Sequence, residues 1–266
     1  MKKIISVLAL CFLFAGQAFG DVYVGGKKLI LPDGDSLTEG VGDAVVPLAG
    51  YRDHLQDEIG TTQWEIVGAQ VKPVYAAGYK TNHNGYSSGS TAHTEESTPF
   101  ALTRYFTPFT PEGSVVILWV GTNDVSRTIS GTPGYSQANA RDNIEDILDL
   151  IRTHNTNIRV LVVNLGPNGD ATRDSNMVTF NGLVTTMLAT YSSTYPNFDI
   201  DYVDMRASLS ADAFNLCDPT GAVTATVIAN CYDDTTHFND LGYQHVAKQL
   251  AACLNNPDAA YCDSTP

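Results

Sequence analysis

Basic residues and long apolar runs are both scarce in this sequence of 266 residues. The chain has 15 lysines and arginines against 29 aspartates and glutamates, which gives a net charge of −14 at pH 7. A surface this acidic repels nucleic acid and anionic lipid, so neither is expected as a partner. After the first 20 residues no apolar run is long enough to cross a bilayer, so no membrane anchor is expected.

The start of the chain has the pattern of a secretory signal peptide. Lys2 and Lys3 precede an apolar run over residues 4–15 that is too short to span a bilayer, and small residues follow it. We therefore predict a signal peptide over residues 1–20 and export to the periplasm or the medium. Its removal takes away two lysines and no acidic residue, so the net charge of −14 becomes −16.

Cysteines are few, and their number is informative. Cys11 lies in the predicted signal peptide, which leaves four in the mature chain. An even number in an exported chain favours two disulfides, and proximity favours Cys217–Cys231 and Cys253–Cys262 among the three possible pairings. Free thiols or a metal cluster are the alternative, although the spacings match no zinc pattern. No cofactor or metal site is expected, and a structural calcium among the loop carboxylates is the alternative, for which no ligand spacing is diagnostic.

Apolar runs alternate with helical patterns along the mature chain. Five runs have the composition of strands: Leu29–Leu31, Trp64–Val67, Ser114–Val120, Ile158–Val163 and Ile200–Val203. Helical spacing is found over Pro47–Ile59, around Ile144–Ile151 with Ser136 as a start signal, around Phe180–Leu188 and around Tyr243–Leu254. The alternation predicts an α/β fold with a parallel sheet covered by helices on both faces. No break in composition and no repeat is present, so residues 21–266 are expected to form a single domain, and polar stretches 80–98 and 206–235 are expected to be long connections.

Three short motifs carry groups that can perform chemistry. They are Gly34-Asp35-Ser36-Leu37, Gly121-Thr122-Asn123-Asp124 and Asp234-Thr235-Thr236-His237. Together they supply a hydroxyl, an amide, a carboxylate and an imidazole, the groups needed to attack a carbonyl, hold an oxyanion and move a proton. Ser36 and Asn123 each follow a predicted strand, and ligands of parallel sheets bind at the carboxyl ends of the strands.

Each motif also has a simpler interpretation. Ser36 could cap a helix, and Asn123 could end a strand in a turn. Asp234 could be a capping residue and His237 a solvated residue, both ahead of the helix that contains Tyr243. In the functional interpretation, the spacing of three residues lets the Asp234 carboxylate approach one imidazole nitrogen of His237 and leaves the other for Ser36.

The sequence contains one rival nucleophile and several other histidines. Residues 85–89 match the G-x-S-x-G pattern, which would make Ser87 the nucleophile. That pattern requires a strand before it and a helix after it, and neither is predicted, so Ser36 is preferred. The other histidines are expected to be packing or surface residues: His54, His83, His93, His154 and His245.

In this order, the three motifs resemble the first, third and fifth blocks of the SGNH (GDSL) hydrolase superfamily. The resemblance implies a Ser36 nucleophile, an Asp234 and His237 acid–base pair, and an Asn123 side chain that completes the oxyanion hole. It also implies a glycine of the second block that donates a backbone N–H, and by position this is Gly85. The oxyanion hole would then consist of Ser36, Gly85 and Asn123. The family's fold is a three-layer, flavodoxin-like α/β/α sandwich with a five-stranded parallel sheet.

Further stretches are similar to carbohydrate esterase family 3, the acetylxylan esterase-like group. They are Tyr51-Arg52, Val67-Gly68, His83-Asn84-Gly85-Tyr86-Ser87 and Asn239-Asp240-Leu241-Gly242-Tyr243. The fifth block departs from the family's frequent Asp-Gly-x-His-Pro pattern, because Thr235 and Phe238 replace the glycine and the proline.

This resemblance implies a secreted serine esterase that works through an acyl-enzyme and removes acetyl groups from plant polysaccharide. The expected partner is an acetylated polysaccharide or a small ester, and a monomer is expected. A GDSL lipase or aryl esterase with the same triad is the alternative among enzymes. A non-catalytic carbohydrate-binding protein on the same fold is the alternative from another class.

Overall fold

The computed structural model describes residues 26–43, 49–71, 82–107, 110–217 and 229–263. The predicted signal peptide and the predicted helix start at Pro47 lie outside these ranges. None of the helices within them is long and apolar enough to cross a membrane.

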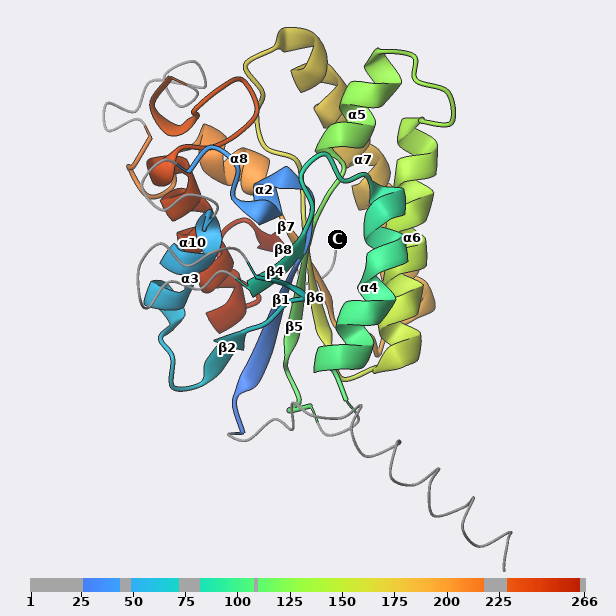
Figure 1. Ribbon diagram of the computed structural model, residues 1–266, viewed down its shortest axis with the longest axis vertical. Coiled ribbons are helices and arrows are strands. Elements are labelled where there is room, and N and C mark those ends of the chain that lie inside the picture. Colours follow the sequence, from blue (N-terminus) through green and yellow to red (C-terminus); the bar gives the residue numbers. More distant parts are fainter. Residues whose placement is uncertain (1–25, 44–48, 72–81, 108–109, 218–228, 264–266) are drawn as a thin grey trace, which may run out of the picture.

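The centre of the molecule is a sheet whose strands run in the order β3-β4-β1-β5-β6-β7-β8, with β2 also paired to β1 (Figure 1). The strands are β1 (Lys28–Gly34), β2 (Trp64–Ile66), β3 (Gln70–Val71), β4 (Asn82–Gly85), β5 (Val115–Trp119), β6 (Arg159–Val163), β7 (Ile200–Val203) and β8 (Cys262–Asp263). All pairs from β2 and β4 through to β7 are parallel, and the two short strands β3 and β8 are antiparallel to their neighbours.

The predicted parallel α/β sheet is confirmed, but the sheet has eight strands rather than five. The five predicted strands are β1, β2, β5, β6 and β7. Strands β2 and β4 share one position beside β1, because β2 pairs with Lys28–Ile30 and β4 with Asp33–Gly34. The parallel part therefore occupies five positions, one of them split between two strands.

Helices cover both faces of the sheet, as predicted. They are α2 (Ser36–Glu39), α3 (Tyr51–Ile59), α4 (Thr91–Tyr105), α5 (Thr122–Ile129), α6 (Gln137–His154), α7 (Ala171–Thr194), α8 (Met205–Ser210) and α10 (Asp240–Asn255). Helix α10 packs against α3 and α8 on one side, and α6 packs against α4 and α7 on the other (Figure 1). Ser136 caps α6, as its position predicted, and its hydroxyl accepts the Asn139 N–H at 3.0 Å.

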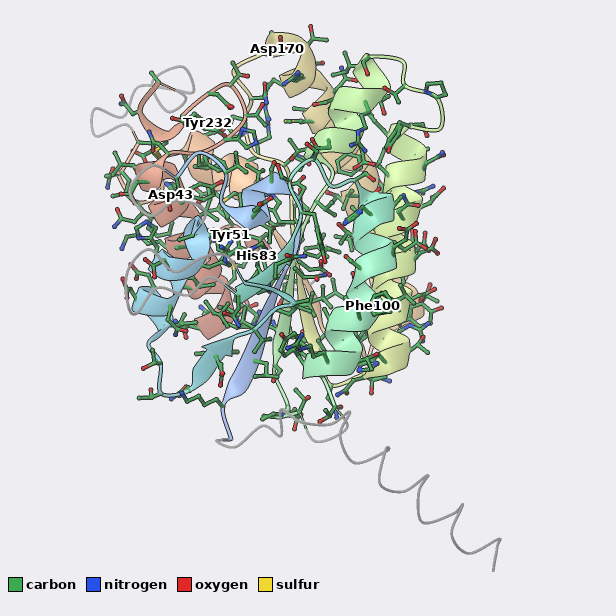
Figure 2. All side chains as sticks on the ribbon, in the orientation of Figure 1. Asp43, Tyr51, His83, Phe100, Asp170 and Tyr232 are labelled. Carbon is green, nitrogen blue, oxygen red and sulfur yellow. A yellow bond between two sulfur atoms is a disulfide. The ribbon has the colours of Figure 1, made fainter. Side chains whose placement is uncertain are left out.

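Helix α4 corrects the expectation that residues 80–98 form a connection. Its buried residues include Thr91, Thr94, Thr98 and Leu102, which follow helical spacing. Because most of this inner face is threonine, the helix carries no apolar stripe that a sequence pattern would reveal. Its outer face bears Phe100, which is strongly exposed (Figure 2). The other connection, 206–235, likewise contains α8.

Strand β1 ends in a glycine because another strand lies too close for a side chain. A Cβ atom on Gly34 would lie 2.0 Å from the carbonyl oxygen of Trp119 on β5. The chain then turns directly into α2, where Gly40 caps the C-terminus in the left-handed conformation. Ser36 is the first residue of α2. It therefore lies at the carboxyl end of the sheet.

Asp33, on β1, is fully buried and hydrogen-bonded within the protein. Its Oδ1 accepts from Asn84 Nδ2 at 2.8 Å, and its Oδ2 lies 2.7 Å from Thr98 Oγ1. The Thr98 hydroxyl also lies 2.7 Å from the Thr94 carbonyl, and it has one proton for the two contacts. Burial raises the pKa of Asp33 to about 7, although these hydrogen bonds oppose the rise. A protonated Asp33 donating to Thr98 satisfies both contacts.

The buried carboxyl of Asp33 makes stability depend on pH. Because its folded pKa lies above its ordinary value of 3.8, the folded state holds this proton more tightly, and stability is lost as pH rises from about 4 to 7. In Asp33→Asn the amide donates to Thr98 permanently, so this loss disappears. We expect the difference in free energy of unfolding between the two proteins to change by ~1–4 kcal/mol across this range. Urea unfolding at pH 4, 5.5 and 7 measures it, and parallel profiles would contradict it.

Candidate active site

The Ser36 hydroxyl lies beside the imidazole of His237, although the two residues are 201 positions apart in the chain. Ser36 Oγ is 3.0 Å from His237 Nε2. The Ser36 side chain is buried at the start of α2, where Asp35 caps the helix by accepting the Leu37 N–H at 3.0 Å. The structure thus brings a residue following the first strand next to a loop near the end of the chain.

Asp234 holds the other side of the His237 ring. Its Oδ2 lies 2.8 Å from His237 Nδ1, while its Oδ1 accepts the backbone N–H groups of Thr236 and His237 at 2.6 and 2.7 Å. Burial raises the pKa of Asp234, but the hydrogen bonds from His237 and Thr236 outweigh it, so the pKa is lowered. An ionised Asp234 favours the tautomer with the proton on Nδ1, which leaves Nε2 free to accept the Ser36 proton.

The loop that carries Asp234 and His237 is anchored by aromatic packing. Phe238 is buried and stacks on Trp119 at the end of β5, with ring centroids 5.8 Å apart. Its ring also contacts Tyr232 at 4.4 Å and Tyr243 at 5.6 Å. Phe238 stands where the family often has proline, and here its ring fixes the position of the neighbouring histidine.

The structure contains the disulfides Cys217–Cys231 and Cys253–Cys262. The first ends three residues before Asp234, and the Cys231 carbonyl accepts the Asn239 N–H at 3.0 Å. The second joins α10 to β8, at the edge of the sheet. Of the two disulfides, Cys217–Cys231 is therefore the one that holds the loop carrying Asp234 and His237.

Removing each disulfide should separate stability from activity. Cys217→Ala/Cys231→Ala opens a loop with a sequence separation of 14, which should lower the free energy of unfolding by ~3 kcal/mol and also lower kcat/KM. The matched variant Cys253→Ala/Cys262→Ala should lose stability but keep most of its activity. Thermal unfolding and ester hydrolysis well below both Tm values test this, and equal losses of activity in the two variants would contradict it.

Asn123 lies at the start of α5 and is tied to α2 through a buried carboxylate. Asp35 accepts the N–H of Leu37 on one oxygen and that of Thr122, at 3.2 Å, on the other. Burial raises the pKa of Asp35 to about 6, although these hydrogen bonds oppose the rise. The Asn123 amide donates one of its two protons to the Gly89 carbonyl at 2.9 Å. Within the part of the chain that the structure describes, its second amide proton has no acceptor and is available to a ligand.

Gly85 occupies a different environment from that expected of an oxyanion donor. Its N–H donates to His83 Nδ1 at 2.9 Å, so it is already used within β4. Gly89, the last residue of the G-x-S-x-G match, contacts Asn123 directly through its carbonyl. The signal that could have singled it out is its position just before α4, but that helix was not predicted.

The prediction that no strand precedes residues 85–89 and no helix follows them was wrong. Gly85 is the last residue of β4, and α4 begins at Thr91. Ser87 is nevertheless exposed, and among the described residues it makes no hydrogen bond to a histidine. Ser36 is the serine that contacts His237.

A second arrangement of serine, histidine and aspartate lies inside the protein. Ser208 Oγ is 3.0 Å from His245 Nε2, and His245 Nδ1 is 3.5 Å from Asp212. All three are buried, and burial lowers the pKa of His245 to about 4, so the ring is neutral at pH 7. Asp212, His245 and Cys217 are also the group within the described ranges that lies close enough to hold a metal ion, but the Cys217 sulfur is bonded to Cys231. This cluster is a packing element without access to substrate.

Arg52, from one of the stretches similar to carbohydrate esterase family 3, contacts α2, the helix that begins with Ser36. It is fully buried on α3, and its guanidinium donates to the Thr38 carbonyl on α2. Burial lowers the pKa of Arg52 to about 10, which still leaves it charged at pH 7. Tyr51, buried beside it and labelled in Figure 2, packs against Trp119 with ring centroids 5.8 Å apart.

Two hollows are lined in part by residues of α2, Leu37 in one and Glu39 in the other. A notch of about 10 Å³ is lined by Leu37, Thr122, Leu165, Gly166, Pro167, Asn168, Met177, Tyr232, Thr236 and Phe238. A cavity of about 540 Å³ lies between α2, the segment joining β4 to α4, and α5. The two differ greatly in size and in chemistry, since the notch is largely apolar and the cavity carries charged and aromatic side chains.

Solved structures of esterases share this fold. A family 3 carbohydrate esterase from Clostridium thermocellum is 19% identical over 84% of this chain and 93% of its own, with a TM-score of 0.58. One from Talaromyces cellulolyticus is 17% identical over 86% and 96%, also with a TM-score of 0.58. The acetyl xylan esterase AlAXEase is 19% identical over 84% and 97%, with a TM-score of 0.57. These likenesses confirm the predicted fold.

No curated protein matches the chain. The description "GDSL-like Lipase/Acylhydrolase" belongs to the family that matches residues 30–250, which is most of the sequence. This match includes all three motifs of the sequence analysis. The chain therefore belongs to the GDSL-like lipase/acylhydrolase family, and it is a carboxylic ester hydrolase.

Proposed function

We propose that the protein is a secreted serine esterase that removes acetyl groups from plant polysaccharide of the acetylxylan type. The observation that carries the proposal is the unbroken chain of hydrogen bonds from Ser36 through His237 to Asp234, at 3.0 and 2.8 Å. It lies at the carboxyl end of the sheet, where α/β proteins bind their ligands.

The reaction proceeds in two steps. His237 Nε2 takes the proton of Ser36 as its Oγ attacks the ester carbonyl, and Asp234 stabilises the imidazolium. The tetrahedral intermediate collapses as His237 gives that proton to the leaving sugar oxygen, which leaves acetyl-Ser36. Water then attacks the acyl-enzyme, with His237 taking its proton and returning it to Ser36 as acetate leaves.

The oxyanion is held by N–H groups near the start of α2 and α5. Ser36 is the first residue of its helix, so its own N–H has no partner within that helix. The second amide proton of Asn123 is the next donor. Gly85 is the third, provided that its N–H exchanges His83 for the oxyanion when substrate binds.

Removing the Asn123 amide tests this arrangement. Asn123→Ala should lower kcat on the order of 10²–10³-fold, because the oxyanion loses a fixed donor. Asn139→Ala is the matched control, since that amide also donates to a glycine carbonyl, that of Gly134, on the surface. Steady-state hydrolysis of 4-nitrophenyl acetate measures both. Activity of Asn123→Ala within threefold of the wild type would remove Asn123 from the oxyanion hole.

The small notch supports an acetyl group as the acyl part. It is bracketed by Leu37, Thr122 and Thr236, which adjoin Ser36, Asn123 and His237 in the sequence. A volume of about 10 Å³ is close to the minimum that holds one water molecule. A long acyl chain would therefore fit only if the loop that carries Asp234 and His237 moved away from α2. Two of the similar structures are carbohydrate esterases and one is an acetyl xylan esterase by name, in agreement with this choice.

Acetate release from a panel of acetylated polysaccharides, with Ser36→Ala as control, tests the proposed substrate. We expect acetate from acetylated xylan and a preference for acetate over decanoate among nitrophenyl esters. Rapid hydrolysis of decanoate without release of acetate from any polysaccharide would instead identify a GDSL lipase or aryl esterase of broad specificity.

Export is part of the proposal. It is supported by the signal pattern of residues 1–20 and by the two disulfides, which persist in oxidising compartments. The monomeric state remains a prediction.

A further inference from the structure

We infer that the cavity of about 540 Å³ is a subsite for the sugar that carries the ester, and that it selects neutral sugars over acidic ones. We call it the sugar cavity and define it by Glu39, Tyr86, His93, Glu96, Arg127 and Tyr135. The inference rests on the proposed function and names the part of the site that distinguishes a polysaccharide from a simple ester. Its volume lies within the ~300–1,000 Å³ of small-molecule sites.

Helix α2 places the sugar cavity and the notch on opposite sides of the nucleophile. Leu37 lines the notch and Glu39 lines the sugar cavity. Two residues along an α-helix differ in direction by about 200°, so these side chains point to opposite sides of the turn that Ser36 begins. An ester bound at Ser36 can therefore direct its acyl group into the notch and its alcohol into the sugar cavity.

Asn123 separates the two hollows in the same way. The preceding residue, Thr122, lines the notch, whereas the Asn123 amide donates to the carbonyl of Gly89, which lines the sugar cavity. The proposed oxyanion donor thus lies at the boundary between them. Two independent elements, α2 and α5, define the same division.

The walls of the sugar cavity suit a sugar better than an alkyl chain. The Tyr135 ring lies under the guanidinium of Arg127, 4.8 Å from its centroid, and its hydroxyl accepts from Arg127 at 2.7 Å. Arg127 also donates to the Ser88 carbonyl at 2.8 Å, which joins this wall to the β4–α4 segment. On the other wall Tyr86 packs edge-on against His93, with centroids 4.4 Å apart. Fixed rings beside polar groups can contact the C–H face of a sugar and bond its hydroxyls.

The charges of the sugar cavity favour a neutral sugar. The sugar cavity is lined by two carboxylates, Glu39 and Glu96, and by one guanidinium, Arg127. The buried Arg52 attracts Glu39, and Arg127 attracts Asp124 at the start of its own helix, so Glu96 is the carboxylate for which the structure gives no cationic partner among the described residues. The mature chain also carries a net charge of −16 by the predicted cleavage. A uronate would therefore be repelled, whereas the exposed Glu96 carboxylate can accept hydrogen bonds from neutral hydroxyls.

The test compares two substrates that share an acetyl group. Acetylated xylo-oligosaccharide uses the sugar cavity, whereas 4-nitrophenyl acetate presents a flat phenol in place of a sugar. The readout is the ratio of kcat/KM for the first to kcat/KM for the second. Tyr135→Ala should lower this ratio roughly tenfold, and Tyr135→Phe, which keeps the ring, should lower it less than about threefold.

A matched aromatic pair outside the sugar cavity provides the control. The guanidinium of Arg152 lies 3.9 Å from the Tyr195 centroid, a second cation–π contact of the same kind. Tyr195→Ala should leave the ratio unchanged, even if it lowers stability. A second experiment tests the charge selection. The wild type should have a higher kcat/KM for acetylated xylo-oligosaccharide than for acetylated oligogalacturonate, and Glu96→Gln should reduce the ratio of these two values.

The outcomes distinguish a failure of the proposed sugar subsite from a failure of the proposed function. If the wild type deacetylates oligosaccharide but Tyr135→Ala and Tyr86→Ala both keep the wild-type ratio, the subsite is wrong and the proposed function stands. If the wild type hydrolyses 4-nitrophenyl acetate but no acetylated oligosaccharide, the proposed function is wrong, and the subsite with it. A preference for oligogalacturonate would overturn the selection of neutral sugars.

Discussion

Replacing Ser36 by alanine is expected to lower kcat for ester hydrolysis on the order of 10⁶-fold, the loss found when a serine hydrolase loses its nucleophile. The expected loss follows from the contact between Ser36 Oγ and His237 Nε2 at 3.0 Å. Without the hydroxyl no acyl-enzyme forms, and only water activated within the site can attack the ester. Titration of released acetate at high enzyme concentration measures the residual rate.

The control for this prediction is the serine of the rival motif. Ser87→Ala should lower activity less than tenfold, because Ser87 is exposed and contacts no histidine among the residues that the structure describes. Circular dichroism should show that both variants fold like the wild type. A large loss in Ser87→Ala together with a small loss in Ser36→Ala would move the nucleophile to the other motif.

Replacing Asp234 by asparagine should lower kcat about 10⁴-fold, although the substitution preserves size and shape. In the protein one carboxylate oxygen accepts the N–H groups of Thr236 and His237, and the other faces His237 Nδ1. An asparagine would keep its oxygen toward the two backbone donors, so its amino group would face Nδ1. The ring would then carry its proton on Nε2 and could not accept one from Ser36.

Asp233→Asn is the neighbouring control, because Asp233 is exposed and, among the described residues, its one hydrogen bond is from its backbone N–H to the His237 carbonyl at 2.8 Å. Its activity should stay within about threefold of the wild type. Steady-state kinetics on 4-nitrophenyl acetate compares the two variants. A kcat for Asp234→Asn within tenfold of the wild-type kcat would mean that the carboxylate does not set the tautomer of His237.

The sequence allowed the sheet to be predicted where strands are buried on both faces. Strand β5 is a continuous apolar run. Strands β6 and β7 are apolar except for Arg159 and Asp201, which are buried and form an ion pair with each other. Helix α4 and strand β4 escaped prediction because most of their buried positions hold threonine, asparagine or histidine. Polar residues are buried there because they bond to one another, as Asp33 does with Asn84 and Thr98, and such pairings depend on tertiary contacts.

The candidate site was predictable in its residue types but not in its geometry. Ser36 and Asn123 follow strands, and this position alone indicated the functional edge of the sheet. The occupied N–H of Gly85 could not be inferred, since it depends on the orientation of the His83 ring. Nor could the sequence separate the accessible pair of Ser36 and His237 from the sealed pair of Ser208 and His245, because burial decides between them.

The most direct test is to locate the covalent bond that the esterase forms with an acyl-like inhibitor. The mature protein is treated with a fluorophosphonate, digested, and the modified peptide is sequenced by mass spectrometry. We expect one adduct, on the Ser36 hydroxyl, and none after Ser36→Ala or after replacement of His237 by alanine. An adduct on another serine, or no adduct in a protein that still hydrolyses esters, would contradict the assignment of Ser36 as the nucleophile.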